Sequence, residues 1–366
     1  MKIIVLAPHD DNHTAPIKWA LERAGFPIVC WAGLGWVPEE QASIALADLA
    51  DHDVIRLGPH TVEPGDAIWI RRPEPPQPNP KTAEADKKFA SLEYRMFYQS
   101  IAYLLEKLPV WCINKYSAGR AIIQKAVQLH LARQCGLKIP ATMMSNSPAP
   151  VRDFFSRGGR TICKGFTPHI WQKDGHRSVA ITETFELTPE QLPADEVLTY
   201  APAIYQELVP KEFDVRMFLM GNRVYSYALH NPKKALDWRQ DCGFGHVKVE
   251  RIETPPAVEK GVLEFARRAD LATGSLDFGV DAQGQWWFLE INEQGQFLWI
   301  DQFDRSARLL EKFCAFITAP EGSTKPLEAR QDLFPSLAEY EELVNSQGPP
   351  QPTQSRQADA FLSVEA

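Results

Sequence analysis

Strand-like and helix-like runs alternate through the first hundred residues, and this alternation restricts the fold more than any other feature of the chain. The runs KIIVLA, FPIVCWA and DAIWIRR have the length and the β-branched content of buried strands, whereas APIKWALERAG, EEQASIALADLA and LEYRMFYQSIAYLLEKL have helix-like patterns. Such alternation is typical of an open α/β sheet. We therefore predict an N-terminal α/β domain at residues 1–110.

The rest of the chain divides by pattern into three further parts. The second part begins near Trp111, and its run AIIQKAVQLHLARQCGLKIPAT has apolar residues at helical spacing until Gly136 and Pro140 end the helix. The short runs TICKGF, SVAITETFEL and AIYQELV that follow predict antiparallel strands. We predict a lid-like unit at 111–209, a third unit at 210–320 and an extension at 321–366. The extension has linker composition and is expected to be largely disordered, although 327–344 is compatible with a helix. The proline-rich stretch 73–86 predicts a loop, either a plain surface loop or one that gates a substrate.

Two hairpins can be placed within the third unit. DVRMFLM and RVYSYAL flank Gly221-Asn222, a two-residue turn of the kind that hairpins prefer. SLDFGV and QWWFLEIN flank DAQG, at 281–284. If that second turn has an even number of residues, Val280 pairs with Gln285 and Asp277 lies opposite Phe288. An odd number would turn Asp277 away from Glu290.

The second hairpin carries polar residues on an otherwise apolar strand. Because side chains alternate between the two faces of a strand, Asp277, Glu290 and Asn292 are expected on one face, with Leu289 and Ile291 toward the core. Three oxygen donors of this kind suit Mg²⁺, which takes one or two protein carboxylates and completes its shell with water and phosphate oxygens. The alternative is a half-exposed strand with solvated carboxylates.

A phosphate-binding glycine loop is missing from the sequence. There is no G-x-x-x-x-G-K-[ST], and Gly33 with Gly35 lacks the third glycine of a dinucleotide loop. Phosphates would therefore be held by side chains. Lys125 and Lys164 are the candidates, because an ammonium group supplies a point charge to phosphate oxygens; the alternative is that both are ordinary lysines.

Composition and charge exclude several classes of partner. A formal charge of -8 and a pI near 5.7 do not indicate the basic surface that nucleic-acid binding requires. The first apolar run, 3–7, is too short for a signal peptide, and no run approaches the length of a membrane span. The six cysteines have no C-x-x-C pair, which favours neither zinc nor a disulfide framework and suggests a reducing cytoplasm.

Several motifs together resemble a known superfamily. The chain resembles the ATP-grasp ligases of the ribosomal protein glutamate ligase type in a series of motifs that occur in the same order. These motifs are Lys125 followed by LARQCGLKIP, Lys164 at the end of a strand, YQELV before KEFDVRMFLMGNRV, DWR, and LDFGV with FLEIN. A closer resemblance, to the graspetide synthetases typified by the microviridin ligases, includes IWIRRPEPPQP and EINEQGQFLWID and so extends into the first unit. The resemblance implies an ATP-grasp fold, α/β in class, preceded by a pre-ATP-grasp domain.

The resemblance also implies roles for individual residues, with ATP and Mg²⁺ as cofactors. Lys125 and Lys164 would hold ATP phosphates, and Asp214 would bind the ribose. Arg216 and Arg239 would stabilise charge during catalysis. The adenine hinge would be formed by Gln206, Glu207, Leu208 and Val209, and the metal ligands would be Asp277, Glu290 and Asn292.

The function that the resemblance implies is the ATP-dependent cross-linking of a peptide. Asp or Glu side chains of a ribosomal precursor peptide, with a leader and an acidic core, would be activated as acyl phosphates and joined to Thr, Ser or Lys as esters or amides. One alternative is a ligase that joins a free amino acid to a small acid or a protein terminus. Another is a peptide-binding module without activity. No nucleic acid or membrane is expected as a partner, and the resemblance is compatible with a homodimer.

Overall fold

The computed structural model of the chain describes residues 1–8, 10–47, 53–167, 170–172, 179–181, 184–232, 247–319 and 328–347. It divides into two compact units, of which unit 1 comprises Met1–Arg120, Asp270–Thr273 and Gln294–Ala366, and unit 2 comprises Ala121–Ala269 and Gly274–Glu293. Among the described residues, no helix is both long and apolar enough to cross a membrane.

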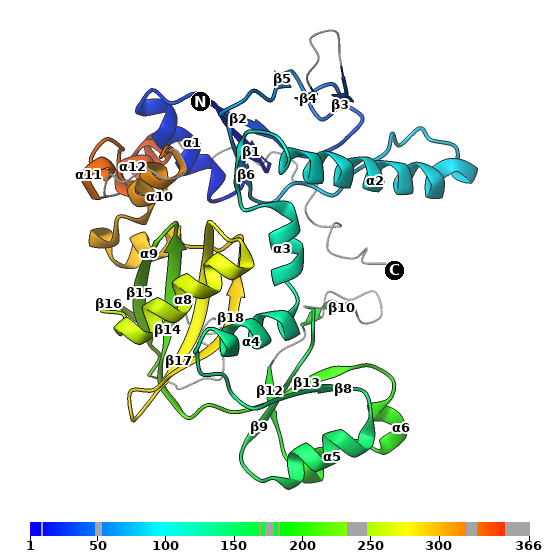
Figure 1. Cartoon of the computed structure of the whole chain (residues 1–366), viewed down its shortest axis with the longest axis vertical. Helices are drawn as coiled ribbons and strands as arrows, with labels where there is room; N and C mark the ends of the chain where they lie inside the picture. The colour runs from blue at the N-terminus through cyan, green and yellow to red at the C-terminus, as the bar shows by residue number, and fades with distance from the viewer. Residues whose placement is uncertain are drawn as a thin grey trace. The chain divides into compact units, whose positions relative to one another are not determined.

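Unit 1 is built on a parallel sheet with the strand order β2-β1-β6-β7 (Figure 1). Its strands and first helices are β1 (Ile3–Leu6), α1 (Thr14–Arg23), β2 (Ile28–Trp31), β6 (Ala67–Ile70), η1 (Glu84–Asp86), α2 (Lys87–Leu105) and β7 (Trp111–Ile113). The three predicted strands are confirmed, and every residue of β1 and β6 is buried. Trp111–Ile113, which we placed at the start of the second part, is the fourth strand of this sheet. Helix α3 (Tyr116–Ile122) then crosses into unit 2.

One helix prediction in unit 1 is wrong. Residues 39–50 were expected to be helical, but Ala42–Ala45 is strand β3, paired antiparallel with β4 (Val54–Leu57), which pairs in turn with β5 (His60–Thr61). Ala42 and Ile44 pack against the core while Ser43 and Ala45 are exposed. This period of two residues is that of a strand, and the tertiary contact overrides the helical composition of the flanking sequence.

The C-terminal part of unit 1 is helical. It contains α9 (Leu298–Phe303), η3 (Arg305–Ala307), α10 (Leu309–Ile317), α11 (Glu328–Gln331) and α12 (Leu337–Gln347). All residues of α10 are buried, and α12 packs on α1, where the rings of Trp19 and Tyr340 lie 5.4 Å apart. The helix allowed within 327–344 is therefore present. The remaining parts of the predicted extension, 321–327 and 348–366, lie outside the described residues.

Unit 2 begins with α4 (Lys125–Gln134) and an antiparallel sheet in the order β12-β9-β13-β8, which we call the lid sheet. The antiparallel strands predicted for this part of the chain are confirmed. The elements are β8 (Thr142–Ser145), α5 (Pro148–Ser156), β9 (Thr161–Lys164), β12 (Phe185–Leu187), η2 (Pro189–Gln191), α6 (Asp195–Leu198) and β13 (Ala203–Glu207), with β10 (Ile170–Gln172) and β11 (Val179–Ile181) as a separate pair. Val151, Phe154 and Phe155 of α5 pack on Tyr205 to form a small core.

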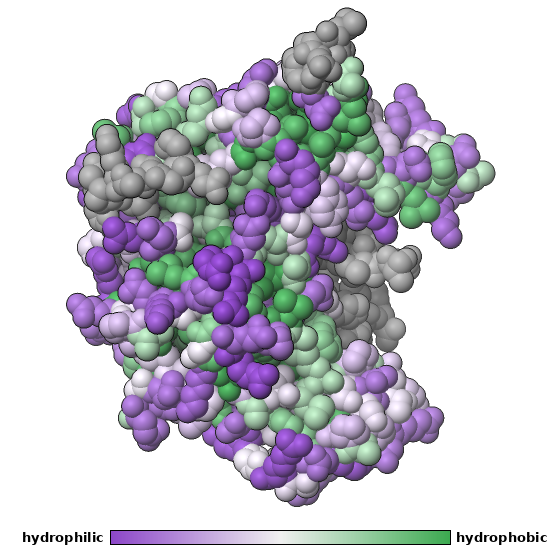
Figure 2. Space-filling view, in the orientation of Figure 1, coloured by the Kyte–Doolittle hydropathy of each residue, from purple (hydrophilic) through white to green (hydrophobic). Residues whose placement is uncertain are grey.

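The second sheet of unit 2 has the order β16-β15-β14-β17-β18. Its strands are β14 (Lys211–Met220), β15 (Arg223–His230), β16 (Lys248–Ile252), β17 (Thr273–Asp281) and β18 (Trp286–Asn292), and α4 and α8 (Pro256–Ala269) lie along it (Figure 1). Helix α8 is amphipathic: Val262 and Phe265 are fully buried, whereas Glu264 pairs with arginines on the outward side, which is hydrophilic in Figure 2.

The first predicted hairpin of this sheet is confirmed. Met220 pairs with Arg223 across the turn Gly221-Asn222, and Gly221 adopts a φ of 61°, which glycine tolerates without strain. The pairing continues without interruption to Asp214 and Leu229. Asp214, Arg216, Phe218 and Met220 therefore share one face of β14, as predicted.

The predicted register of the second hairpin is wrong near its turn. Val280 pairs with Trp286, so the turn contains five residues rather than four. The carboxylate of Asp281 accepts hydrogen bonds from the backbone N–H groups of Gln283 and Gln285, which draws Gln285 into the turn. Side-chain bonding of this kind is how an aspartate sets a turn, and it lengthens the loop by one residue.

A β-bulge then corrects the register before the polar residues are reached. Phe278 pairs with Phe288, but Asp277 pairs with Glu290, so Leu289 has no partner on β17. Phe288 packs on Phe265 of α8, with 5.6 Å between the rings, and the extra residue turns Glu290 to the other face, beside Asp277. The prediction that Asp277 and Glu290 share a face is thus confirmed, through an odd turn and a bulge that compensate for each other.

Candidate functional site

A row of polar side chains crosses three strands of the five-stranded sheet, on the face turned away from Phe288 and α8. Asp214 and Arg216 lie on β14, Asp277 on β17 and Glu290 on β18. Asp214, Arg216 and Asp277 are each only 7% exposed. Charged groups are rarely buried to this degree unless they are paired, so this face is a candidate functional site rather than a solvated surface.

Each acidic group of this row contacts a cationic side chain. Arg216 Nη1 donates to Asp277 Oδ1 at 2.7 Å, and Lys125 Nζ, at the first turn of α4, donates to Glu290 Oε2 at 2.5 Å. Lys211 Nζ donates to Asp214 Oδ1 at 2.6 Å. These three basic groups lie beside the carboxylates, where an ammonium or a guanidinium can also meet anionic oxygens of a ligand.

The donor set fits a magnesium ion. Asp277 and Glu290 are directly opposite each other, which places cross-strand Cβ atoms about 4.5–5.5 Å apart, close enough for one cation to be shared. Asn292, exposed at the end of β18, adds an amide oxygen. In the part of the chain that the structure describes, no three or more His, Cys, Asp or Glu residues gather to hold a metal. Two carboxylates and an amide suit a hard cation that takes further oxygens from a ligand, rather than a closed zinc cage.

The lid sheet contributes a second polar group. Lys164 Nζ donates to Gln206 Oε1 at 3.1 Å, and Gln206 Nε2 donates to Thr142 Oγ1 at 2.8 Å. Gln206 is buried, and these two hydrogen bonds hold both the oxygen and the nitrogen of its side-chain amide. The amide oxygen therefore orients the Lys164 ammonium. The neighbouring Cys163 is no nucleophile, because burial raises the pKa of its thiol to about 11 and keeps it protonated at neutral pH.

The predicted adenine hinge joins the lid sheet to β14. The backbone N–H of Glu207 donates to the carbonyl of Ala141, and that of Leu208 donates to the carbonyl of Arg160, both at 2.8 Å. Val209 is buried. The segment is therefore held on both sides by neighbouring backbone, and its role in binding adenine stays a prediction.

The structure thus places the predicted site residues of unit 2 at the first turn of α4, on the lid sheet, in the hinge and on one face of the larger sheet, while Arg239 lies outside the described residues. Two further residues were missed by the sequence reasoning. Lys211 pairs with Asp214, and Gln128 of α4 bonds to the backbone of Ile291, between Glu290 and Asn292. The position of Gln128 three residues after Lys125, on the same side of a helix, was the signal that could have indicated it.

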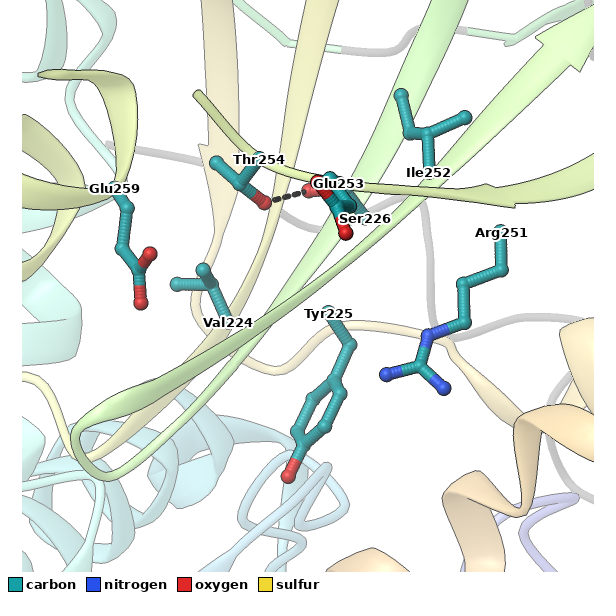
Figure 3. Close-up of a pocket in the computed structure, with 8 residues that line it drawn as sticks. All are labelled: Val224, Tyr225, Ser226, Arg251, Ile252, Glu253, Thr254 and Glu259. Atoms are coloured by element: carbon teal, nitrogen blue, oxygen red, sulfur yellow. Dashed lines mark hydrogen bonds between the residues drawn. The ribbon is translucent and has the colours of Figure 1, made fainter. Parts of the chain in front are cut away.

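A separate hollow of about 490 Å³ lies at β15, β16 and the first turn of α8. Tyr225 and Arg251 extend from the two strands on the same side, and Ser226 bonds to Thr254 behind them (Figure 3). None of the predicted site residues lines this hollow. The polar row and this hollow are therefore different places on the same sheet.

Comparison with known proteins identifies the fold. No protein-family model matches the chain, and the search of curated proteins found no match. Solved structures do match, and several of them are ATP-grasp proteins. The chain therefore has the ATP-grasp fold, as the sequence predicted.

Among the matching structures are two that contain bound peptides. The RiPP-associated ATP-grasp ligase of Chryseobacterium gregarium, in complex with ADP and a leader and core peptide, is 22% identical with a TM-score of 0.74, over 87% of this chain and 96% of that chain. Macrocyclase MdnC of Microcystis aeruginosa MRC, bound with precursor peptide MdnA, is 22% identical with a TM-score of 0.65, over 83% and 95% of the two chains. A RimK domain ATP-grasp protein of Sphaerobacter thermophilus DSM 20745 is 13% identical with a TM-score of 0.50, over 87% and 100%. Both resemblances inferred from the motifs are thus confirmed in the fold.

Proposed function

We propose that the protein is an ATP-dependent carboxylate ligase that cross-links a ribosomal precursor peptide. Asp or Glu side chains of an acidic core would be activated as acyl phosphates and joined to Thr, Ser or Lys as esters or amides. The observation that carries the proposal is the pairing of Asp277 directly with Glu290, each beside a basic side chain. The fold shared with ligases bound to ADP and to leader and core peptides supports it. We place this activity in the cytoplasm.

In this proposal Asp277, Glu290 and Asn292 would hold Mg²⁺, which when bound neutralises charge on the nucleotide phosphates. Lys125 and Lys164 would bind the phosphate oxygens through their ammonium groups. The hinge 206–209 would hold the adenine, and Asp214 the ribose. Lys211 keeps the Asp214 carboxylate in place.

Two bond-forming steps follow from this arrangement. An oxygen of the substrate carboxylate attacks the γ-phosphorus, so that the bond to the β-phosphate oxygen breaks and ADP leaves. The hydroxyl or amine then attacks the acyl carbon, loses its proton and expels inorganic phosphate. Both steps gather negative charge, and the fixed guanidinium of Arg216, with Arg239 as its proposed partner, would stabilise that charge.

The experiment uses short acidic peptides encoded beside the gene. Each is incubated with the protein, ATP and Mg²⁺, and its intact mass is recorded. Loss of one water per cross-link, with release of ADP, is the expected result. ADP formed only when free amino acids are supplied, with no change in peptide mass, would instead favour the ligase of free amino acids.

Site variants test the metal assignment in the same assay. Glu290→Gln combined with Asn292→Ala should abolish Mg²⁺-dependent ATP turnover while leaving the thermal unfolding of the protein within a few degrees of the parent. Glu250→Gln, which changes an exposed carboxylate on β16 of the same sheet, is the matched control and should retain turnover. Unchanged turnover in the double variant would overturn the assignment.

A further inference from the structure

The side chain of Gln128 closes the outer edge of the strand that carries Glu290 and Asn292. Its Oε1 accepts from the backbone N–H of Ile291 at 3.1 Å, and its Nε2 donates to the backbone carbonyl of the same residue at 3.0 Å. Its second Nε2 hydrogen goes to the carbonyl of Ile122 at 2.7 Å. Gln128 is 1% exposed. One side chain therefore pairs with both backbone groups of Ile291, as a neighbouring strand would.

Only an uncharged primary amide satisfies this position. Two acceptors, both carbonyls, and one donor, a backbone N–H, surround the Gln128 head group. A primary amide offers two N–H donors and one carbonyl acceptor, which matches this set, whereas a carboxylate offers acceptors alone. β18 is the outermost strand of its sheet, and its outer edge needs such partners because buried backbone groups are costly when unpaired.

The place at which Gln128 acts points to a role in the site. Ile291 lies between Glu290 and Asn292, so fixing its backbone sets the direction of both neighbouring side chains. Lys125, one helical turn earlier on α4, binds the Glu290 carboxylate itself. The same side of α4 therefore holds the strand at Ile291 and the carboxylate at Glu290. Pairing with β17 is interrupted by the β-bulge at Leu289 and resumes at Glu290, so Gln128 restrains the outer edge of β18 two residues after that irregularity.

We propose that Gln128 is a positioning residue that holds Glu290 and Asn292 in the geometry required to bind the divalent cation of the nucleotide. This inference rests on the proposed function for the identity of the cation and of the nucleotide. It makes no demand on the peptide substrate. Partners that orient metal ligands change metal affinity by about 10–100-fold when they are removed, and an effect in this range is expected here.

The test compares Gln128→Met, which keeps the length of the side chain without its hydrogen bonds, with Leu129→Ala. Leu129 is the next residue on α4 and is buried, so its truncation destabilises the same helix and leaves the amide intact. Gln128→Glu is a third variant, which keeps the acceptor for Ile291 N–H and loses both donors. Amide hydrogen exchange is measured without ligands, and ADP affinity is measured by calorimetry with Mg²⁺ and with EDTA.

In Gln128→Met, exchange at Ile291 should quicken by about tenfold or more, and the gain in ADP affinity that Mg²⁺ provides should fall by about tenfold. Affinity in EDTA should change less than about twofold. Gln128→Glu should show the same pattern, and Leu129→Ala should not. Equal losses with and without Mg²⁺, or the same selective loss in Leu129→Ala, would overturn the proposal. Wild-type protein whose ADP affinity does not depend on Mg²⁺ would instead overturn the proposed function, and this inference with it.

Discussion

The ion pair between Arg216 and Asp277 gives the sharpest test of the energetics of the site. Both residues are buried, and Arg216 Nη1 lies 2.7 Å from Asp277 Oδ1. Replacing Arg216 alone with methionine leaves a carboxylate beside Glu290 without its arginine. Replacing both, as Arg216→Met with Asp277→Leu, removes the two charges together and fills the space with apolar groups.

The two changes should differ greatly in cost. Breaking a buried pair by removing one partner destabilises a protein by about 3–5 kcal/mol, because the remaining charge is not compensated. Replacing the whole pair with apolar groups of similar volume is close to neutral, since the desolvation of both ions is no longer required. We therefore expect Arg216→Met to lower the free energy of unfolding by about 3–5 kcal/mol and the double variant to lower it by less than about 1 kcal/mol.

Urea unfolding followed by circular dichroism, with the two single variants and the double variant, gives the coupling energy between the residues. A loss of less than about 1 kcal/mol in Arg216→Met would show that the pair is solvated and that the burial argument is wrong. A double variant whose loss equals the sum of the two single losses would show that the residues act independently.

Two further predictions concern unit 1. Burial raises the pKa of the Asp301 carboxyl to about 7, although two backbone N–H groups donate hydrogen bonds to it. Because the pKa is higher in the folded protein, the contribution of Asp301 to the free energy of unfolding should be full below pH 4 and lost as the pH rises through 7. The difference in unfolding free energy between the parent and Asp301→Asn should therefore fall by on the order of 3–4 kcal/mol from pH 4 to pH 8 in urea titrations, and a difference that does not vary with pH would contradict this. Phe334 is buried, and its ring lies 5.6 Å from that of Phe26. Phe334→Ala should therefore lower the free energy of unfolding by about 3–5 kcal/mol, whereas Leu333→Ala, at an exposed position, should change it by less than about 0.5 kcal/mol.

The elements that could be predicted from sequence are those whose pattern is local. β1, β2 and β6 are short β-branched runs that are buried in a parallel sheet, and the turn at Gly221-Asn222 is specified by its own two residues. For Ala42–Ala45 the sequence predicts a helix, because the helix-like neighbours outweigh a strand pattern of only four residues. The segment forms a strand because it pairs with β4, and this contact lies outside the local sequence.

The site was predicted in part, for a similar reason. The meeting of Asp277 and Glu290 follows from a hairpin with polar positions, but neither the five-residue turn nor the bulge at Leu289 has a signal in the residues considered singly. The ion pairs of Lys125 and Arg216 join positions 165 and 61 residues apart, which no spacing along the chain reveals. The roles given to the individual site residues remain predictions, and Arg239 lies outside the described residues.

The bulge at Leu289 separates the two ends of its hairpin. Near the turn, the pairing of β17 with β18 is set by Asp281 and its hydrogen bonds, whereas beyond the bulge it resumes with Asp277 opposite Glu290, and Gln128 of α4 binds the backbone of Ile291. A residue gained or lost in the turn could be absorbed by losing or widening the bulge, without rotating Glu290 away from Asp277. A change in the length of the hairpin tip therefore need not alter the positions of the two carboxylates.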